Sequence, residues 1–108
     1  MTIQTESEST GIAIITGSAG ALGKAIVSQL AEDGYDIALN DVPKNKGALE
    51  SLAEDVRQKG RKAIVVIGDI TVENEVKKLV ETTTEKLGGL DVVSTSFRLN
   101  ERDNLNLS

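Results

Sequence analysis

Four short apolar runs divide the chain and predict four buried strands. They begin 24, 26 and 28 residues apart, and each is rich in β-branched or aliphatic residues without strict polar alternation. Continuous apolar runs of this kind suit strands buried on both faces, as in a parallel sheet covered by helices. The expected strands are residues 12–16, 36–40, 62–67 and 90–93.

The segments between these runs have the period of an amphipathic helix. Apolar residues recur three or four positions apart and therefore share one face of each expected helix. Gly34, Gly60 and the pair Gly88-Gly89 are expected to end the three helices, and Thr71 is the expected N-cap of the third. The apolar positions are Leu22, Ala25, Ile26 and Leu30, then Leu49, Leu52, Ala53 and Val56, then Val72, Val76, Leu79, Val80, Thr83 and Leu87.

Strands that alternate with helices predict the α/β class and a three-layer, Rossmann-like parallel sheet of four strands with three helices. Because crossovers between parallel strands are right-handed, the expected strand order is 3-2-1-4. We assign residues 11–93 to this domain and residues 1–10 to a flexible N-terminal segment. From position 94 the chain is rich in Asn, Ser and charge, so residues 94–108 are expected to form a divergent, disordered tail.

Composition excludes several kinds of site and partner. Twelve Lys and Arg against 17 Asp and Glu give a net charge of −5, so neither nucleic acid nor an anionic membrane surface is an expected partner. Cys and His are absent, which removes disulfides, Cys/His metal sites and Ser-His catalysis; no metal site is expected. No apolar run approaches the roughly 18 residues of a membrane span, and we expect a soluble, cytoplasmic protein.

A glycine-containing loop between the first strand and the first helix carries the candidate chemistry. It reads Thr16-Gly-Ser-Ala-Gly-Ala-Leu-Gly23. Glycines at such a turn let backbone N–H groups approach a diphosphate, and the helix N-terminus adds a favourable dipole. A Walker-type phosphate loop would need Gly at position 18 and Ser or Thr at position 25, where the chain has Ser18 and Ala25. The alternative interpretation is that the glycines only form a tight turn and that the loop binds no ligand.

Asp41 follows at the end of the second expected strand, 18 positions after Gly23. A carboxylate at this place can accept hydrogen bonds from the adenosine ribose, and it repels a 2′-phosphate. NAD is therefore the expected cofactor and NADP the less favoured one, although Lys44 and Lys46 would soften the repulsion. The alternative is that Asp41 only opens a turn before Pro43.

These residues resemble the short-chain dehydrogenase/reductase family, whose cofactor loop reads T-G-x-x-x-G-x-G. Thr16, Gly17 and Gly23 match family positions. Ala21 stands at the position of the middle glycine, and Gly20 comes one position early. The added methyl group would weaken contact with the diphosphate, unless Gly20 lets the loop shift.

The resemblance extends over residues 12–93 and implies a set of cofactor-binding residues. Asp41 matches the ribose-binding acid of the NAD-using members, and Asp69 matches a residue near the adenine; a turn-forming role ahead of Thr71 is equally open for Asp69. The implied reaction is hydride transfer between a nicotinamide cofactor and an alcohol or carbonyl substrate. The implied cofactor-binding residues are Thr16, Gly17, Ser18, Ala21, Leu22, Gly23, Asp41, Asp69 and Ile70.

The resemblance ends after the fourth strand. The family has Asn-Asn-Ala-Gly there, whereas this chain has Ser94-Thr-Ser-Phe97. The family's catalytic Ser and Tyr-x-x-x-Lys pair come later, so no catalytic residue is assigned. Tyr35 cannot replace that Tyr, because it precedes the second strand and Leu39 stands four positions on.

We therefore expect the NAD(P)-binding portion of a short-chain oxidoreductase that is inactive alone. A frameshift, a retained intron or a mispredicted gene would explain the change of character at position 94. The alternative is a non-catalytic module that binds NAD or an adenine nucleotide, or that associates with another chain. Self-association is expected through the exposed sheet edge of the fourth strand, which would offer unpaired N–H and C=O groups.

Overall fold

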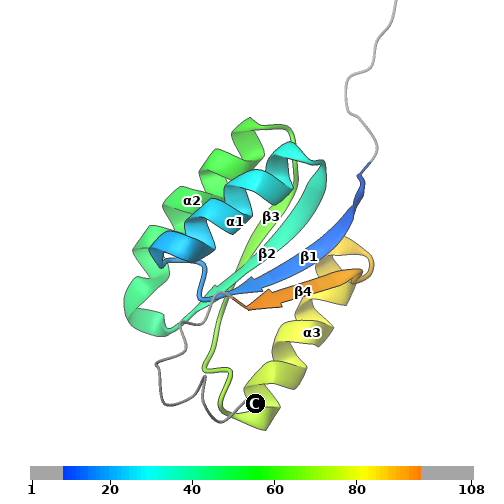
Figure 1. Cartoon of the computed structure of the whole chain (residues 1–108). Helices are drawn as coiled ribbons and strands as arrows, with labels where there is room; N and C mark the ends of the chain where they lie inside the picture. The colour runs from blue at the N-terminus through cyan, green and yellow to red at the C-terminus, as the bar shows by residue number, and fades with distance from the viewer. Residues whose placement is uncertain (1–8, 96–108) are drawn as a thin grey trace, which may run out of the picture.

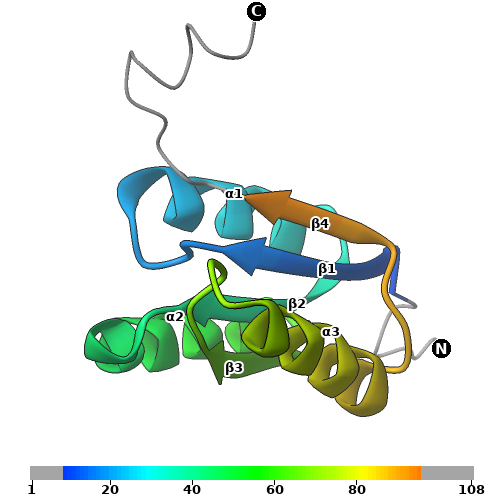
Figure 2. The same cartoon turned by 90° about the horizontal axis from the view of Figure 1, so that it is seen from below.

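The expected strands form one parallel sheet in the computed structural model, which describes residues 9–95 (Figure 1). The sheet order is β3-β2-β1-β4, which confirms the expected order, and Figure 2 shows β3 and β4 at its opposite edges. In chain order the elements are β1 (Gly11–Thr16), α1 (Ala21–Glu32), β2 (Tyr35–Asp41), the short 3-10 helix η1 (Pro43–Asn45), α2 (Lys46–Gln58), β3 (Ala63–Ile67), α3 (Glu73–Leu87) and β4 (Val92–Thr95).

Helices cover the two faces of the sheet unequally. Ile15 of β1 and Leu39 of β2 join a cluster that packs against α1 and α2. Ile14 points to the opposite face, because successive strand residues alternate, and it packs with Leu79 and Leu87 of α3 in a smaller cluster. Within residues 9–95, one helix therefore covers the face on which Ile14 lies, and two helices cover the other.

Burial decreases from the central strands toward β4. The inner residues of β1 and β2 are fully buried, as the continuous apolar runs predict. In β4, half-buried and exposed residues alternate. Val93 pairs with Ile14, on the face that α3 covers, yet it is 60% exposed. The cover provided by α3 therefore does not extend over Val93.

The fourth strand begins two residues later than expected. Asp91 comes before the strand, where its Oδ2 accepts a hydrogen bond from Ile12 N at 2.9 Å and its own N–H donates to Ile12 O at 2.8 Å. Asp91 thus anchors the turn that brings β4 beside β1. Ser94 and Thr95, which we had assigned to the tail, belong to the strand. Residues 1–8 and 96–108, which hold the rest of the two expected terminal segments, lie outside the described residues.

Helix ends follow the glycines, but two helix details differ from the prediction. Gly34, Gly60 and Gly88 have positive φ angles at the ends of α1, α2 and α3, as expected. The N-cap of α3 is Val72, because the helix begins at Glu73; Thr71 lies one residue earlier, where its hydroxyl donates to Asp69.

The inward face of α1 is turned by one residue from the predicted stripe. Gly23, Val27 and Ala31 are its buried residues, whereas Ile26 is half-buried and Leu22 is 58% exposed. The small side chains at 23 and 31 let the helix approach the sheet closely, and sequence periodicity alone favours the larger neighbours.

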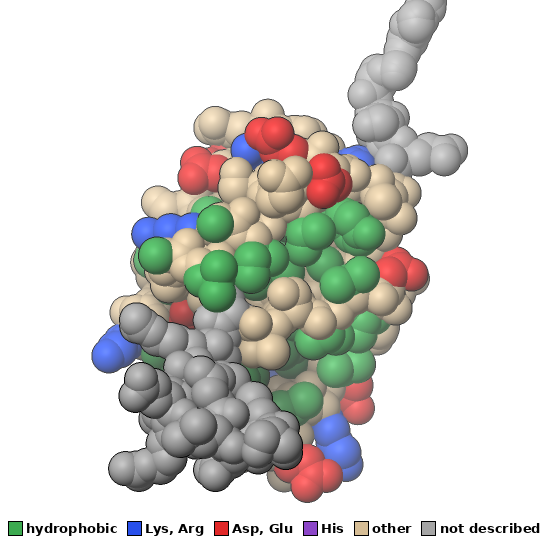
Figure 3. Space-filling model, in the orientation of Figure 1, with side chains coloured by type: hydrophobic (Ala, Val, Ile, Leu, Met, Phe, Trp, Pro, Cys, Tyr) green, Lys and Arg blue, Asp and Glu red, His purple; other side chains and the backbone are tan. Residues whose placement is uncertain are grey.

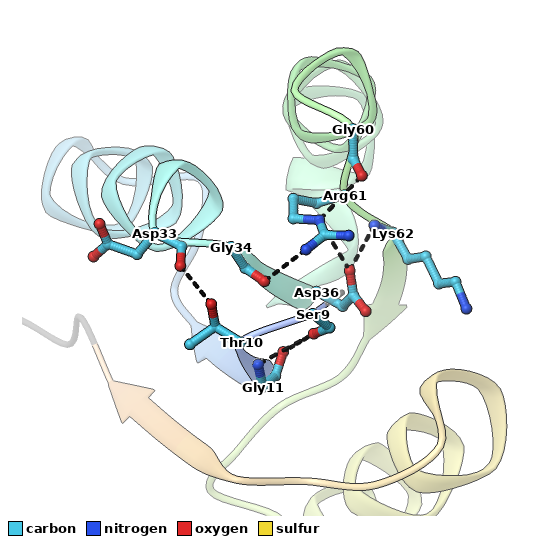
Figure 4. A network of polar contacts seen from close by, with 9 residues as sticks. All are labelled: Ser9, Thr10, Gly11, Asp33, Gly34, Asp36, Gly60, Arg61 and Lys62. Carbon is cyan, nitrogen blue, oxygen red and sulfur yellow. Dashed lines mark hydrogen bonds and ion pairs between the residues drawn. The ribbon is translucent and has the colours of Figure 1, made fainter. Parts of the chain in front are cut away.

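A buried ion pair closes the amino ends of β2 and β3 (Figure 4). Arg61 Nε lies 3.6 Å from Asp36 Oδ1, and these side chains are 9% and 6% exposed. The same Asp36 oxygen accepts a hydrogen bond from Lys62 N, and Arg61 Nη1 donates to Gly34 O, both at 2.9 Å. Nothing in the hydrophobic pattern of the sequence predicts this network.

Candidate functional site

The glycine loop follows β1 and is fixed to two strands from within. Ser18 is fully buried. Its hydroxyl donates to Ile15 O at 2.7 Å, and its backbone N–H donates to Asn40 O at 3.0 Å. Gly17 has φ +66°, a conformation that favours glycine. The buried hydroxyl of Ser18 therefore holds the loop in place and does not face outward.

Close packing of the loop on α1 requires glycine at position 23. A Cβ there would lie 2.2 Å from Gly17 O and 2.8 Å from Ser18 Cα. Gly20 differs, since a Cβ there would meet only Gly17 O, at 3.7 Å. Gly20 is also the N-cap of α1 and supplies no side-chain cap. Ala21, at the position of the family's middle glycine, is the exposed first residue of the helix.

Asp41 ends β2, where the sequence analysis placed it, and three N–H donors fix its carboxylate. Oδ2 accepts a hydrogen bond from Ala19 N at 2.9 Å. Oδ1 accepts from Val42 N at 2.8 Å and from Asn45 Nδ2 at 3.1 Å. The bond from Ala19 links this carboxylate directly to the glycine loop.

Asn40 is a residue of this region that the sequence analysis missed. Its side chain is buried, and Nδ2 donates to Val66 O at 3.0 Å and Gly68 O at 3.3 Å. Through its side chain and its backbone oxygen, Asn40 connects the loop after β3 with the loop after β1. The available signal was an amide inside a run of strand residues buried on both faces, where a polar group needs partners.

Asp69 shapes the loop after β3. Its Oδ1 accepts hydrogen bonds from the hydroxyl of Thr71 at 2.7 Å and from Thr71 N at 2.9 Å. These two bonds, the hydroxyl first, lower the pKa of the exposed Asp69 carboxyl. Asp69 N in turn donates to the Glu75 carboxylate. These contacts give Asp69 the turn-forming role that was one of its two expected roles.

A cavity of about 170 Å³ lies between the loops that follow β1, β2 and β3. Four predicted site residues line it, namely Gly17, Asp41, Asp69 and Ile70, together with Asn40 and Thr71. Thr16, Ser18, Ala21, Leu22 and Gly23 do not line it. Of these five, Thr16, Ser18 and Gly23 are buried in the loop and the start of α1, whereas Ala21 and Leu22 are exposed.

The chemistry of this cavity favours a neutral ligand that donates hydrogen bonds. Among residues 9–95, two carboxylates, of Asp41 and Asp69, line it, and no Lys or Arg does. A larger cavity of about 400 Å³ between α1 and α2 contains none of the predicted residues. Within residues 9–95, no helix is both long and apolar enough to cross a membrane, and no cluster of three acidic, Cys or His side chains could hold a metal ion.

The family described as short chain dehydrogenase matches residues 11–97. The chain belongs to this family. It is 54% identical over 85 residues to the short-chain dehydrogenase/reductase eriH of Hericium erinaceus, a match that covers 77% of this chain and 34% of the relative. It is 40% identical over 81 residues to a diacetyl reductase of Staphylococcus epidermidis, covering 75% and 31%. The chain therefore spans about a third of the length of the curated relatives it matches.

Solved structures support the same assignment. An NAD⁺-bound xylitol dehydrogenase aligns with a TM-score of 0.72 at 34% identity, over 79% of this chain and 32% of that one. A blue fluorescent protein from a metagenomic library, in complex with NADPH, aligns with a TM-score of 0.74 at 34% identity, over 79% and 35%. The family resemblance and the Rossmann-like sheet predicted for this chain are both confirmed.

Proposed function

We propose that this chain binds the adenosine portion of NAD at the carboxyl ends of β1, β2 and β3, as the cofactor-binding part of an oxidoreductase. The observation that carries the proposal is the cavity in which Gly17, Asp41, Asp69 and Ile70 converge from three loops. Its position follows the rule that ligands of open α/β sheets bind at the carboxyl ends of the strands. Membership of the short chain dehydrogenase family supports the same reading.

Each predicted residue has a role in this proposal. Asp41 accepts hydrogen bonds from the ribose, and Asp69 and Ile70 border the adenine. The backbone around Gly17 and the exposed start of α1, at Ala21 and Leu22, face the diphosphate. Thr16, Ser18 and Gly23 hold the loop in shape from within.

The close contact between Gly23 and Gly17 supports the fit of a dinucleotide. The missing Cβ at position 23 lets α1 begin directly behind the loop, so that its first N–H groups and helix dipole reach the diphosphate. In the hydride transfer that the family resemblance implies, a bound nicotinamide would accept or donate the hydride. No catalytic residue is assigned within residues 9–95, so we propose that the chain alone binds the cofactor without turnover.

NAD is the proposed cofactor because of Asp41. A 2′-phosphate would approach its fixed carboxylate, and that of Asp69, and no Lys or Arg of the described part of the chain stands in the cavity wall. The two similar structures have been solved with NAD⁺ in one case and with NADPH in the other. The preference therefore rests on the residues of this chain.

Fluorescence titration of the full chain with NADH and NADPH tests the proposal. We expect saturable binding of NADH, weaker binding of NADPH, and competition by AMP that exceeds competition by 2′-AMP. Asp41→Asn, which keeps the size of the side chain, should remove most of the preference because a neutral amide no longer repels the phosphate. Absence of saturable NADH binding would refute the proposal, and hydride transfer to a carbonyl compound would refute the inactivity.

A second candidate function is self-association through β4. Its outer edge has no strand partner within residues 9–95, and Val93 is exposed beside it. In the view of Figure 3, hydrophobic side chains gather over α1, β1 and β4, whose places Figure 1 shows. A second copy offers the same short, β-branched strand and can continue the sheet by pairing edge to edge.

Light scattering tests this second candidate. We expect a dimer or larger assembly that Val93→Lys shifts to monomer, because edge lysines oppose strand pairing. Lys62→Ala, an exposed change at the far side of the sheet, is the matched control. A stable monomer at tens of micromolar would rule the self-association out.

A further inference from the structure

Asn45 lies where an asparagine normally caps a helix, yet it does not cap α2. It is the N-cap residue of that helix, and its side chain makes no capping hydrogen bond. Asn is favoured at this position because its side-chain oxygen accepts a hydrogen bond from a backbone N–H of the first turn. Here the amide nitrogen instead donates to Asp41 Oδ1, at 3.1 Å.

The turn around Asn45 holds this contact rigidly. Asn45 N donates to Val42 O at 3.0 Å, and Val42 N donates to Asp41 Oδ1 at 2.8 Å. Pro43 stands at the start of η1 and fixes φ there. The backbone and the side chain of Asn45 are therefore both tied to the end of β2.

Asn45 contacts the carboxylate without lining the cavity. The cavity reaches Asp41 and Val42, but Asn45 is not part of its wall. A change at position 45 therefore leaves the cavity wall as it is. Any effect on a ligand in the cavity has to pass through Asp41.

The donors are distributed unequally between the two oxygens of Asp41. Oδ1 accepts two hydrogen bonds, from Val42 N and Asn45 Nδ2, whereas Oδ2 accepts one, from Ala19 N. Each carboxylate oxygen offers about two acceptor sites. Oδ1 is thus saturated, and the remaining acceptor site belongs to Oδ2, beside the glycine loop.

We propose that Asn45 is a positioning residue that saturates Asp41 Oδ1 and thereby directs the remaining acceptor site, on Oδ2, to a ribose hydroxyl. This inference rests on the proposed binding of NAD. A neutral donor leaves the negative charge of Asp41 intact, so the same contact that orients the carboxylate preserves its repulsion of a 2′-phosphate. Asn45 accordingly contributes to the choice of NAD without touching it.

Two substitutions separate this role from capping. Asn45→Ser retains a good N-cap residue but is too short to reach Asp41, and we expect NADH affinity to fall about tenfold, as for loss of a hydrogen bond to a charged group. Asn45→Asp also retains the cap but places two carboxylates in contact, which favours a shared proton. NADH binding by Asn45→Asp should therefore weaken as the pH rises from 6 to 8, whereas wild-type binding stays constant. Ser51→Ala, an exposed change on α2, is the control.

A readout without nucleotide keeps the inference independent of the proposed function. The backbone N–H groups of Ala19 and Val42 both donate to Asp41. In ¹H–¹⁵N NMR spectra of the full chain, Asn45→Ser should shift both signals and speed the hydrogen exchange of Ala19, whereas Ser51→Ala should not.

The two measurements give distinct outcomes. Unchanged Ala19 and Val42 signals in Asn45→Ser would overturn the positioning role, whether or not NADH binds. Shifted signals in a wild-type chain that binds no NADH would refute the proposed function and uphold the positioning of Asp41. The link between Asn45 and the cofactor would be overturned if the signals shift in Asn45→Ser but its NADH affinity is unchanged and NADH binding by Asn45→Asp does not depend on pH.

Discussion

At the amino ends of the strands, Arg61 and Asp36 satisfy each other and the neighbouring backbone, whereas at the carboxyl ends Asn40 and Asp41 hold loops around a cavity of about 170 Å³. Both ends contain buried or half-buried polar groups. The first set forms a closed network, and the second leaves carboxylate oxygens and backbone groups facing a cavity.

This difference shows how one sheet separates stability from binding. A buried charge destabilises the fold unless it is paired, and Arg61 pairs Asp36 at the end of the sheet where no ligand is expected. At the other end, two backbone N–H groups and the side-chain amide of Asn45 orient Asp41, so that its charge stays available. Changes at the amino ends should therefore alter stability alone, and changes at the carboxyl ends should alter binding as well.

Arg61→Met should have the largest effect on stability. It leaves Asp36 buried without its cation, and we expect a loss of about 3 kcal/mol in the free energy of unfolding, measured by urea denaturation. NADH affinity of the folded fraction should not change. Lys62→Ala, next to it but exposed, should change stability by less than about 0.5 kcal/mol. Weaker NADH binding by Arg61→Met would break the separation between the two ends.

Gly23→Ala should have the next largest effect. We expect the free energy of unfolding to fall by about 2–3 kcal/mol and NADH binding to weaken, because the new Cβ displaces the loop at Gly17. Gly20→Ala provides the matched control in the same loop, where the Cβ has room. We expect it to cost about 1 kcal/mol or less, from the poorer N-cap. Equal losses for the two variants would show that the contact between Gly23 and Gly17 does not fix the loop.

Asn40→Ala should lower the free energy of unfolding by about 1–2 kcal/mol, since Val66 O and Gly68 O lose the amide that donates to both. The loop after β3 should loosen, and hydrogen exchange at Thr71 N should become faster. The same change at the exposed Asn74 of α3 controls for loss of an amide. Unchanged exchange at Thr71 would contradict the role given to Asn40.

Thr71→Val should have the smallest effect, visible mainly at acid pH. The hydroxyl and N–H of Thr71 lower the pKa of Asp69, so the charged form stabilises the fold. The contribution of charged Asp69 to stability is complete above the ordinary pKa of Asp, about 4, and is lost as the pH falls through the lowered pKa. In Thr71→Val the pKa of Asp69 should rise toward its ordinary value, measured by NMR titration of the carboxyl. Thr71→Ser should keep it low; equal values in all three proteins would exclude the hydroxyl as the cause.

The order of the elements was predictable because it depends on local patterns. Apolar runs marked the strands, helical periods marked the connections, and the handedness rule then left one strand order. Asp41 could be placed at the end of β2 because the run before it ends there. The family resemblance, together with the glycine loop, singled out Gly17 and Asp69, and both line the cavity.

Contacts between distant segments were not predictable in the same way. Arg61 and Asp36 lie 25 positions apart, and nothing in either neighbourhood identifies the partner. The buried face of α1 depends on how closely Gly23 lets the helix approach, which hydrophobic periodicity does not measure. Thr71 is not the N-cap because α3 begins one residue later than expected, and Thr71 belongs to the turn that Asp69 forms.

The pairing of β1 with β4 also has a consequence for the order of synthesis. β1 leaves the ribosome before β2, and it pairs with β2 soon afterwards. Its other edge waits until residues 92–95 have been made. During this interval a strand that becomes central in the native sheet has an open edge, where nascent chains are prone to mispairing and to capture by chaperones. Chains arrested before and after residues 92–95 would measure the length of that exposure.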